Sequence, residues 1–334
     1  MLSYIGFLEG GVRLPAVQLP VQKWPGRVNE VTLGGDGRKK VVIGGETTLP
    51  FLHFEGPAPR RPVVAVEVQD KDPEGWAASL RQAWGDVLSD SARWAKKAAE
   101  YGADLIALRL SSAHPEGGNT GAEAARKKVS QVLEATDLPV IVLGPEVADK
   151  DNEVLMAAAE AGRGQRLAIG NCVEKNYRTI AAACIANGHV AIGKTPIDIN
   201  LAKQLNILIS DVGVSRDAII MDPTTGALGY GLEYCYSVME RLRLACLQGD
   251  AMTSMPMIST VGEESWRQKE SRASEGVPAA WGQGPERALL WESVTAISLL
   301  GAGADIIVLR HPKSVALAKA SIDKLMAGAG QRSA

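Results

Sequence analysis

Residues 102–118 read GADLIALRLSSAHPEGG, an apolar run that Arg109 interrupts and that a loop of Gly, Ser, Pro and His follows. Residues 303–312, GADIIVLRHP, repeat the pattern almost residue for residue, with Arg310 in the matching place. Short, continuous apolar runs of this kind are typical of parallel strands that are buried on both faces. One structural unit is therefore expected to recur along the chain.

Strand and helix patterns alternate from residue 62 onward. The apolar runs that we predict as strands are 62–68, 104–110, 139–144, 166–170, 189–193, 218–222, 255–260 and 305–310. The helical patterns that follow them are 89–102, 120–136, 150–162, 175–188, 196–210, 231–249, 285–303 and 312–328. Strict alternation favours a parallel sheet, and eight units predict an α/β fold of the (β/α)8 TIM-barrel class. No GxGxxG follows the first strand, which disfavours a dinucleotide-binding sheet.

The first 60 residues differ from this rhythm. Residues 31–51 hold two β-rich runs separated by Gly and Asp, which predicts a hairpin, and the Pro-rich residues 56–62 form a connector. We therefore divide the chain into an N-terminal extension (1–60), a barrel (61–328) and a flexible tail (329–334).

The overall composition excludes several classes of partner. The 334 residues are 46% hydrophobic and 22% charged, with a net charge of −2, so no basic surplus indicates nucleic-acid binding. No apolar run approaches the roughly 20 residues that span a bilayer, and the N-terminus lacks the pattern of a signal peptide. We expect a cytoplasmic protein without nucleic-acid or membrane partners.

The cysteines and histidines do not suggest a metal site. Cys172, Cys184, Cys235 and Cys246 form no C-x2-C pair, and the four histidines form no HxH or HExxH motif. Zinc sites and iron–sulfur clusters usually draw on such close pairs. We expect no metal site and no iron–sulfur cluster in this chain.

Ligands of these barrels bind at the carboxyl ends of the strands, and two arginines stand there. The period of two along a strand places Arg109 and Arg310 on equivalent faces of their strands. Their guanidinium groups could hold an anion or amide carbonyl oxygens in the mouth of the barrel. Alternatively, they could pair with nearby carboxylates at the rim.

Other polar residues follow the remaining strands. Lys194 could form a Schiff base or bind a polar ligand edge at the rim, and Asn171 ends the fourth strand. Asp222, Thr224 and Thr225 could face a ligand, or one of them could simply cap the following helix. No nucleophile or acid–base pair is evident, so we predict no catalytic residue.

The seventh loop, residues 261–284, is long for a barrel and is expected to be flexible. Its Trp266 and Trp281 favour contact with a partner protein, because Trp and Arg are enriched in such contacts. The alternative is that the tryptophans fold back onto the barrel.

Residues 102–118 resemble the second strand and loop of the pterin-binding barrels, dihydropteroate synthase and the methyltetrahydrofolate:corrinoid methyltransferases. That resemblance implies an acid in this strand, but the corresponding positions here are Ala107, Leu108 and Arg109. A pterin presents paired N–H donors, and an arginine has no acceptor to offer them. An independent pterin-dependent methyltransferase is therefore the alternative hypothesis, and a Schiff-base aldolase using Lys194 is a third.

Residues 62–110, 170–206 and 219–250 resemble the small (delta) subunit of the corrinoid iron–sulfur protein. The resemblance implies a barrel that pairs with a large corrinoid- and [4Fe-4S]-containing subunit. Cobalamin would sit at the interface, between the large subunit and the mouth of this barrel. The complex would carry a methyl group from methyltetrahydrofolate methyltransferase to acetyl-CoA synthase in the reductive acetyl-CoA (Wood–Ljungdahl) pathway.

This resemblance, taken with the polar mouth, gives a list of expected cobalamin contacts. The residues are Arg109, Asn171, Lys194, Asp222, Thr224, Thr225 and Arg310. Corrin side chains are amides, which pair with side chains of these types. The chain alone would be non-catalytic, because the cofactor performs the chemistry. Arg109 should then point into the mouth and not into a surface ion pair.

Overall fold

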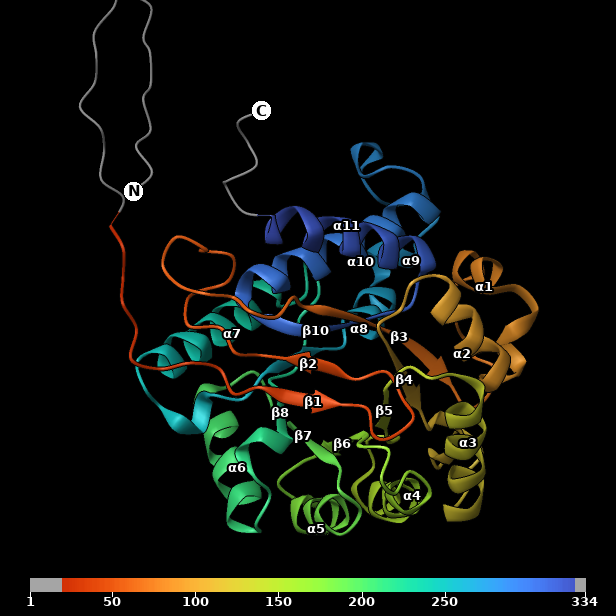
Figure 1. Cartoon of the computed structure of the whole chain (residues 1–334). Coiled ribbons are helices and arrows are strands. Elements are labelled where there is room, and N and C mark those ends of the chain that lie inside the picture. Colours follow the sequence, from red (N-terminus) through yellow and green to blue (C-terminus); the bar gives the residue numbers. More distant parts are fainter. Residues whose placement is uncertain (1–19, 328–334) are drawn as a thin grey trace, which may run out of the picture.

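The computed structural model describes residues 20–327, which contain a closed barrel of eight parallel strands (Figure 1). The strands are β3 (Val63–Gln69), β4 (Leu105–Arg109), β5 (Val140–Leu143), β6 (Ala168–Cys172), β7 (Val190–Lys194), β8 (Ile219–Asp222), β9 (Met257–Ser259) and β10 (Ala304–Leu309). β10 pairs with β3 and closes the barrel. The closed barrel of eight parallel strands confirms the predicted (β/α)8 class. Its apolar strands are buried on both faces, as their sequences predict.

Helices surround the barrel and follow the strands in turn. The main helices are α2 (Ser91–Glu100), α3 (Ala122–Ala135), α4 (Ala148–Ala161), α5 (Tyr177–Asn187), α6 (Ile199–Asp211), α7 (Leu232–Leu247), α10 (Gly284–Ala302) and α11 (Pro312–Met326). Asp90 and Asp198 cap α2 and α6 by accepting hydrogen bonds from backbone N–H groups of the first turn. Within residues 20–327, no helix is long and apolar enough to cross a lipid bilayer.

Three short helices were not expected from the sequence: α1 (Ala78–Trp84), α8 (Val261–Arg267) and α9 (Lys269–Arg272). Each is too short for a clear helical period, and no side chain caps their first turns. Trp84 fixes α1 to the end of β10, because its indole Nε1 donates a 2.8 Å hydrogen bond to the carbonyl oxygen of Arg310. The seventh loop, residues 261–284, was expected to be flexible, but it contains α8 and α9 and is partly helical.

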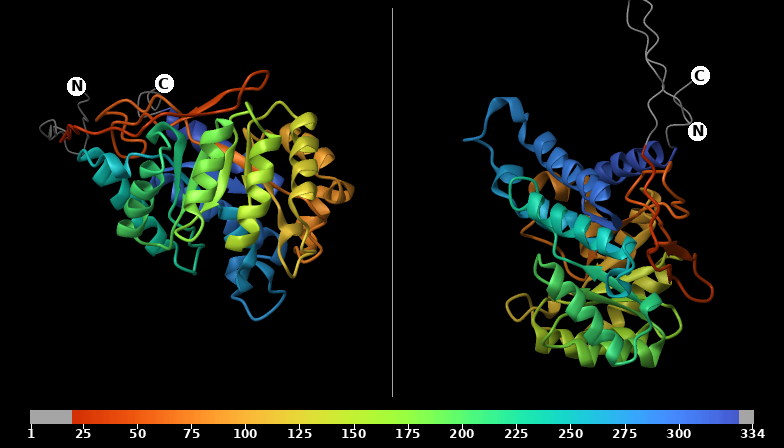
Figure 2. Two further views of the ribbon diagram at one scale, coloured as in Figure 1. Left: turned by 90° about the horizontal axis from the view of Figure 1, so that it is seen from below. Right: turned by 90° about the vertical axis from the view of Figure 1, so that its left-hand side faces the viewer.

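The N-terminal extension closes one end of the barrel. Its strands β1 (Val31–Leu33) and β2 (Val41–Ile43) form the predicted antiparallel hairpin. Their apolar side chains pack in one cluster with interior residues of the barrel strands, such as Val63 and Leu105. Figure 2 shows the hairpin in red at one end of the barrel and the segment around α8 and α9 in blue at the other. The open, polar mouth is therefore at the carboxyl ends of the strands.

The proposed boundaries at residues 60 and 328 stay predictions. The predicted tail, 329–334, and the first 19 residues lie outside the described residues.

Candidate functional site at the barrel mouth

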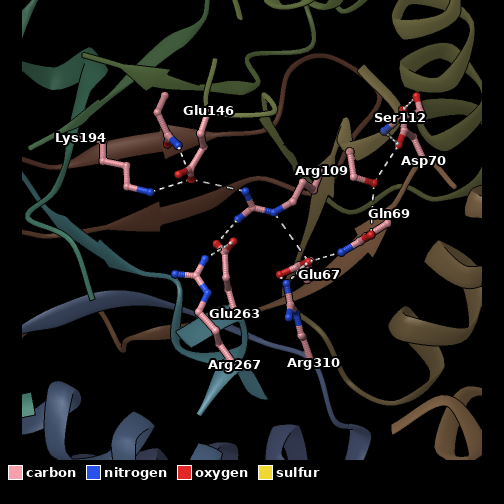
Figure 3. Close-up of polar contacts among 12 residues, drawn as sticks. Glu67, Gln69, Asp70, Arg109, Ser112, Glu146, Lys194, Glu263, Arg267 and Arg310 are labelled. Carbon is pink, nitrogen blue, oxygen red and sulfur yellow. Dashed lines mark hydrogen bonds and ion pairs between the residues drawn. The ribbon is translucent and has the colours of Figure 1, made fainter. Parts of the chain in front are cut away.

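Two buried arginines share one carboxylate at the centre of the mouth (Figure 3). Glu67 on β3 is fully buried, and its carboxylate accepts hydrogen bonds from Arg310 Nη2 at 2.7 Å and Nε at 3.0 Å. Arg109 Nε lies 3.7 Å from Glu67 Oε1. Gln69 Nε2 donates to the same carboxylate at 2.9 Å. Because β3 lies between β10 and β4, the two repeated strand ends flank one acid.

Arg109 reaches two further carboxylates. Its Nη2 lies 2.5 Å from Glu263 Oε2 and its Nη1 lies 3.5 Å from Glu146 Oε1. Burial alone lowers the pKa of Arg109, but the surrounding carboxylates outweigh burial and raise it. Burial raises the pKa of Glu263, but Arg109 and Arg310 outweigh it and lower the pKa to about 2. Arg109 thus points into the mouth, where it forms ion pairs that are largely shielded from water.

Glu146 gathers three donors onto one oxygen. Its Oε1 accepts from Lys194 Nζ at 2.6 Å and from Asn171 Nδ2 at 3.1 Å, beside the Arg109 contact. Glu146 lies between β5 and α4 with a positive φ of 66°, a conformation that non-glycine residues adopt rarely. This turn aims the carboxylate at the ends of β6 and β7, so three predicted residues meet at an acid that the sequence reasoning missed.

Lys194 is a charged ammonium group in this setting. Burial lowers its pKa, but Asp222, its neighbour across the β7–β8 pair, and Glu146 outweigh burial and raise it. Burial raises the pKa of Asp222 to about 6, although Lys194 opposes the shift. A Schiff-base lysine needs a neutral amine, which this environment disfavours.

Asp222 and the two threonines do not cap α7. The N-cap position of α7 is Gly231, where no side chain accepts a capping hydrogen bond. Asp222 Oδ1 instead accepts from the backbone N–H of Thr224 at 2.9 Å, and Thr224 Oγ1 donates to the carbonyl oxygen of Thr195 at 2.6 Å. Thr225 Oγ1 accepts from the backbone N–H of Thr260 at 2.8 Å, so this hydroxyl holds the β8 and β9 ends together.

The sequence reasoning missed the acids of the mouth. Glu67 interrupts an otherwise apolar strand, and such an acid is a signal that could have been used. Glu146 follows a strand end, the same kind of position that Asn171 and Lys194 occupy. Glu263 lies in the first turn of α8, inside the loop that was expected to be flexible, and it also pairs with Arg267 at 3.5 Å.

The two tryptophans of the seventh loop behave differently. Trp266 is buried and stacks on His311, with ring centroids 5.9 Å apart and planes 8° from parallel. Trp266 thus folds back onto the barrel, which was the alternative to a contact with a partner protein. Trp281 is 43% exposed and leans against Trp291, with ring centroids 5.4 Å apart.

A cavity of about 510 Å³ opens beside this charged network, between the ends of β5, β6 and β7 and the helix α6. Its lining residues are Glu146, Ala148, Asp151, Asn171, Val173, Glu174, Lys175, Lys194, Thr195, Pro196, Leu201, Gln204, Leu205, Leu208 and Thr224. A volume of this size is ordinary for a small-molecule site.

No group of three or more His, Cys, Asp or Glu side chains within residues 20–327 is placed to hold a metal ion. The four cysteines are buried and free, and burial raises the pKa of Cys184 to about 12 and that of Cys235 to about 11. Such protonated thiols pack as small apolar side chains. The absence of an iron–sulfur cluster from the whole chain stays a prediction.

Known proteins resemble this chain over most of its length. The family model described as CO dehydrogenase/acetyl-CoA synthase delta subunit matches residues 30–319. The acetyl-CoA decarbonylase/synthase complex subunit delta of Archaeoglobus fulgidus is 38% identical over 312 residues, covering 89% of this chain and 68% of that relative. The subunit of the same name from Methanothermobacter thermautotrophicus is 36% identical over 309 residues, covering 91% of this chain and 78% of that relative.

Solved structures resemble the fold. Dihydropteroate synthase of Coxiella burnetii in complex with pteroic acid has a TM-score of 0.55 at 15% identity, covering 89% of this chain and 98% of that chain. The Xanthomonas albilineans enzyme with 4-aminobenzoic acid also has a TM-score of 0.55, at 17% identity, with coverages of 89% and 98%. At such identities the likeness concerns the barrel and not its chemistry.

Proposed function

Because the chain belongs to the CO dehydrogenase/acetyl-CoA synthase delta-subunit family, we propose that it is the small subunit of a corrinoid iron–sulfur methyl carrier. Its partner is a large subunit that holds the corrinoid and a [4Fe-4S] cluster. The complex shuttles a methyl group from methyltetrahydrofolate methyltransferase to acetyl-CoA synthase in the reductive acetyl-CoA pathway of the cytoplasm.

In this proposal the barrel mouth covers the cobalamin that the large subunit holds. The cobalt supplies the methyl-carrying chemistry when the cofactor is bound. The residues present suit a corrin edge, which bears carboxamide donors and acceptors, because the mouth offers both kinds of partner. Asn171 and Thr195 each have a buried side-chain oxygen that finds no hydrogen-bond partner in the described part of the chain, residues 20–327. Asn171, Lys194 and Thr224 would contact the corrin edge. Arg109 would support them through its contact with Glu146.

The observation that carries this proposal is the closed centre of the mouth. Glu67, Arg109, Arg310 and Glu263 neutralise one another, and Lys194 pairs with Glu146, so none of these groups is a free nucleophile or base. A surface whose charges are largely paired with one another can exclude water and oxidants from a reactive cofactor without reacting itself. The chain would therefore be non-catalytic alone.

The same centre disfavours the second candidate, an independent pterin-dependent methyltransferase. A pterin ring needs a carboxylate with free lone pairs. The buried acid nearest the centre, Glu67, already accepts hydrogen bonds from Arg310 and Gln69. Titration of the isolated chain with methyltetrahydrofolate should give no saturable binding; stoichiometric binding would restore the methyltransferase hypothesis.

Exposed apolar side chains on α10 offer a surface for the large subunit. Leu290, Val294 and Ile297 are all exposed, and their spacing of four and three residues places them on one face of the helix. Tyr234 at the start of α7 and Trp281 are also exposed. The family name of a complex subunit supports a protein partner for this surface.

Co-expression with the large subunit tests the proposal. The purified heterodimer should contain about one corrinoid per pair, and its reduced cobalt should react with a small alkyl iodide more slowly than in the large subunit alone. Equal reaction rates with and without this chain would refute the covering role. A complex without corrinoid absorbance would refute the methyl-carrier assignment.

A further inference from the structure

The cavity beside Lys194 has two unlike walls. Leu201, Leu205 and Leu208 of α6 line one side, and Asn171 and Thr195 belong to the polar side at the ends of β6 and β7. A cavity with an apolar wall and a few placed polar groups is the usual form of a small-molecule site. The ion network of the mouth uses Glu146, Lys194 and the Asn171 amide nitrogen, and it leaves other polar atoms of this wall unpaired.

Two oxygens on the polar side lack hydrogen-bond partners. Asn171 is 3% exposed and Thr195 is 7% exposed, and neither Asn171 Oδ1 nor Thr195 Oγ1 has a partner within residues 20–327. Asn171 Nδ2 already donates to Glu146, so Oδ1 remains as an acceptor. The Thr195 hydroxyl can donate or accept. A primary carboxamide has the complementary groups: its N–H can donate to Asn171 Oδ1, and its carbonyl oxygen can accept from the Thr195 hydroxyl.

The charges around the cavity favour a neutral group over an anion. Glu146, Asp151 and Glu174 line it against Lys175 and Lys194, so it has no positive surplus. The ammonium group of Lys194 is already held at 2.6 Å by Glu146. A carboxylate or phosphate entering beside Lys194 would meet the Glu146 charge, and of the two lysines in the lining Lys194 is already paired with that carboxylate.

We propose that this cavity binds an uncharged carboxamide and that Glu146 rejects the corresponding carboxylate. The identity of the ligand rests on the proposed function: one carboxamide arm of the corrin ring enters the cavity, and the ring edge lies against Leu201. The cavity thus selects fully amidated corrinoids over those in which that arm is an acid.

The heterodimer with its large subunit is the material for the test. Corrinoid is removed, and binding is then measured with cobinamide and with its derivatives in which one peripheral amide is hydrolysed to a carboxylate. Wild type should bind cobinamide at least tenfold more tightly than at least one of these derivatives with a single carboxylate. Glu146→Gln removes the repelling charge and should reduce that ratio to threefold or less. Equal affinities in wild type, or an unchanged ratio in the variant, would overturn the proposal.

A second pair of variants tests the cavity by its volume. Leu201 lines the cavity and is 40% exposed, whereas Ile207 lies on the same helix, is 36% exposed and does not line it. Leu201→Trp should weaken cobinamide binding about tenfold, and Ile207→Trp should leave it unchanged. Both positions are exposed, so neither variant should fail to fold.

The outcomes separate the two proposals. If the wild-type heterodimer binds no corrinoid, the methyl-carrier function and the cavity assignment fail together. If it binds corrinoid equally well in Leu201→Trp and shows no amide preference, the cavity assignment fails and the carrier function stands.

Discussion

The barrel contains buried arginine networks at both ends, and they are built differently. At the hairpin end, Arg243 pairs with Asp305 at 2.9 Å and donates to the backbone oxygen of Gly303 at 2.7 Å. Asp305 also accepts from the backbone N–H of Met257 at 2.7 Å. This network binds side chains to the ends of strands, so it serves the fold.

The network at the mouth joins side chains mainly to one another. Arg109 contacts Glu67, Glu146 and Glu263, which come from three different parts of the chain. Within residues 20–327, Arg109 Nε and Asn171 Oδ1 are buried without hydrogen-bond partners, as is Glu46 Oε2 beside Arg243 at the hairpin end. What distinguishes the two ends is the backbone: a network whose side chains pair mainly with one another can rearrange around a ligand more readily than one tied to strand ends.

The largest effect is expected at the hairpin end. Arg243→Met should lower the free energy of unfolding by about 3–5 kcal/mol, because it leaves the buried Asp305 carboxylate without its cation. Denaturant titration measures this loss. The corrinoid content per folded heterodimer should remain that of wild type. A selective loss of corrinoid would show that the hairpin end also contributes to cofactor binding.

Glu46 at the hairpin end and Glu263 at the mouth should respond to pH in opposite directions. Burial raises the pKa of Glu46, next to Arg243, to about 7, so between pH 4.5 and 7 the folded chain keeps a proton that the unfolded chain releases. This contribution is full below about pH 4.5 and is lost as the pH rises through 7. It has an upper limit of about 3.5 kcal/mol, since one pKa unit corresponds to about 1.4 kcal/mol. Glu46→Gln should flatten the decline in unfolding free energy measured from pH 4.5 to 8.

Glu263 at the mouth should show the reverse. Its pKa of about 2 lies below that of the unfolded chain, so its contribution is present above about pH 4.5 and is lost as the pH falls toward 2. Glu263→Gln should lower the free energy of unfolding at pH 7 by about 1–3 kcal/mol, because Arg109 loses a charged partner. It should also flatten the acid limb of the pH profile; a variant with the wild-type acid limb would contradict the lowered pKa.

An exposed ion pair gives the reference change in unfolding free energy with which the buried pairs at both ends are compared. Arg126 and Glu160 lie 2.9 Å apart, with side chains 40% and 53% exposed. Arg126→Ala should change the free energy of unfolding by about 0–1 kcal/mol, and added salt should shrink the effect further. A loss as large as that of Glu263→Gln would mean that burial does not distinguish the mouth from the surface.

The fold could be read from the sequence because each barrel strand is a short apolar run between turn residues. The mouth residues Arg109, Asn171 and Lys194 were found by their place at strand ends. Their partners were not found, because Glu67, Glu146 and Glu263 meet only once the barrel closes. The predicted barrel already places the strand at 62–68 between those at 104–110 and 305–310, but the sequence does not show that Glu67 contacts both arginines.

The hairpin of β1 and β2 covers one end of the barrel, so ligands can reach the interior only from the mouth. With the opposite end covered, every molecule that reaches the arginines arrives from the mouth. In the proposed cycle, the protein that delivers the methyl group and the protein that receives it would use the same approach. Each should therefore act as a competitive inhibitor of the other, and turnover should fall when either is in large excess.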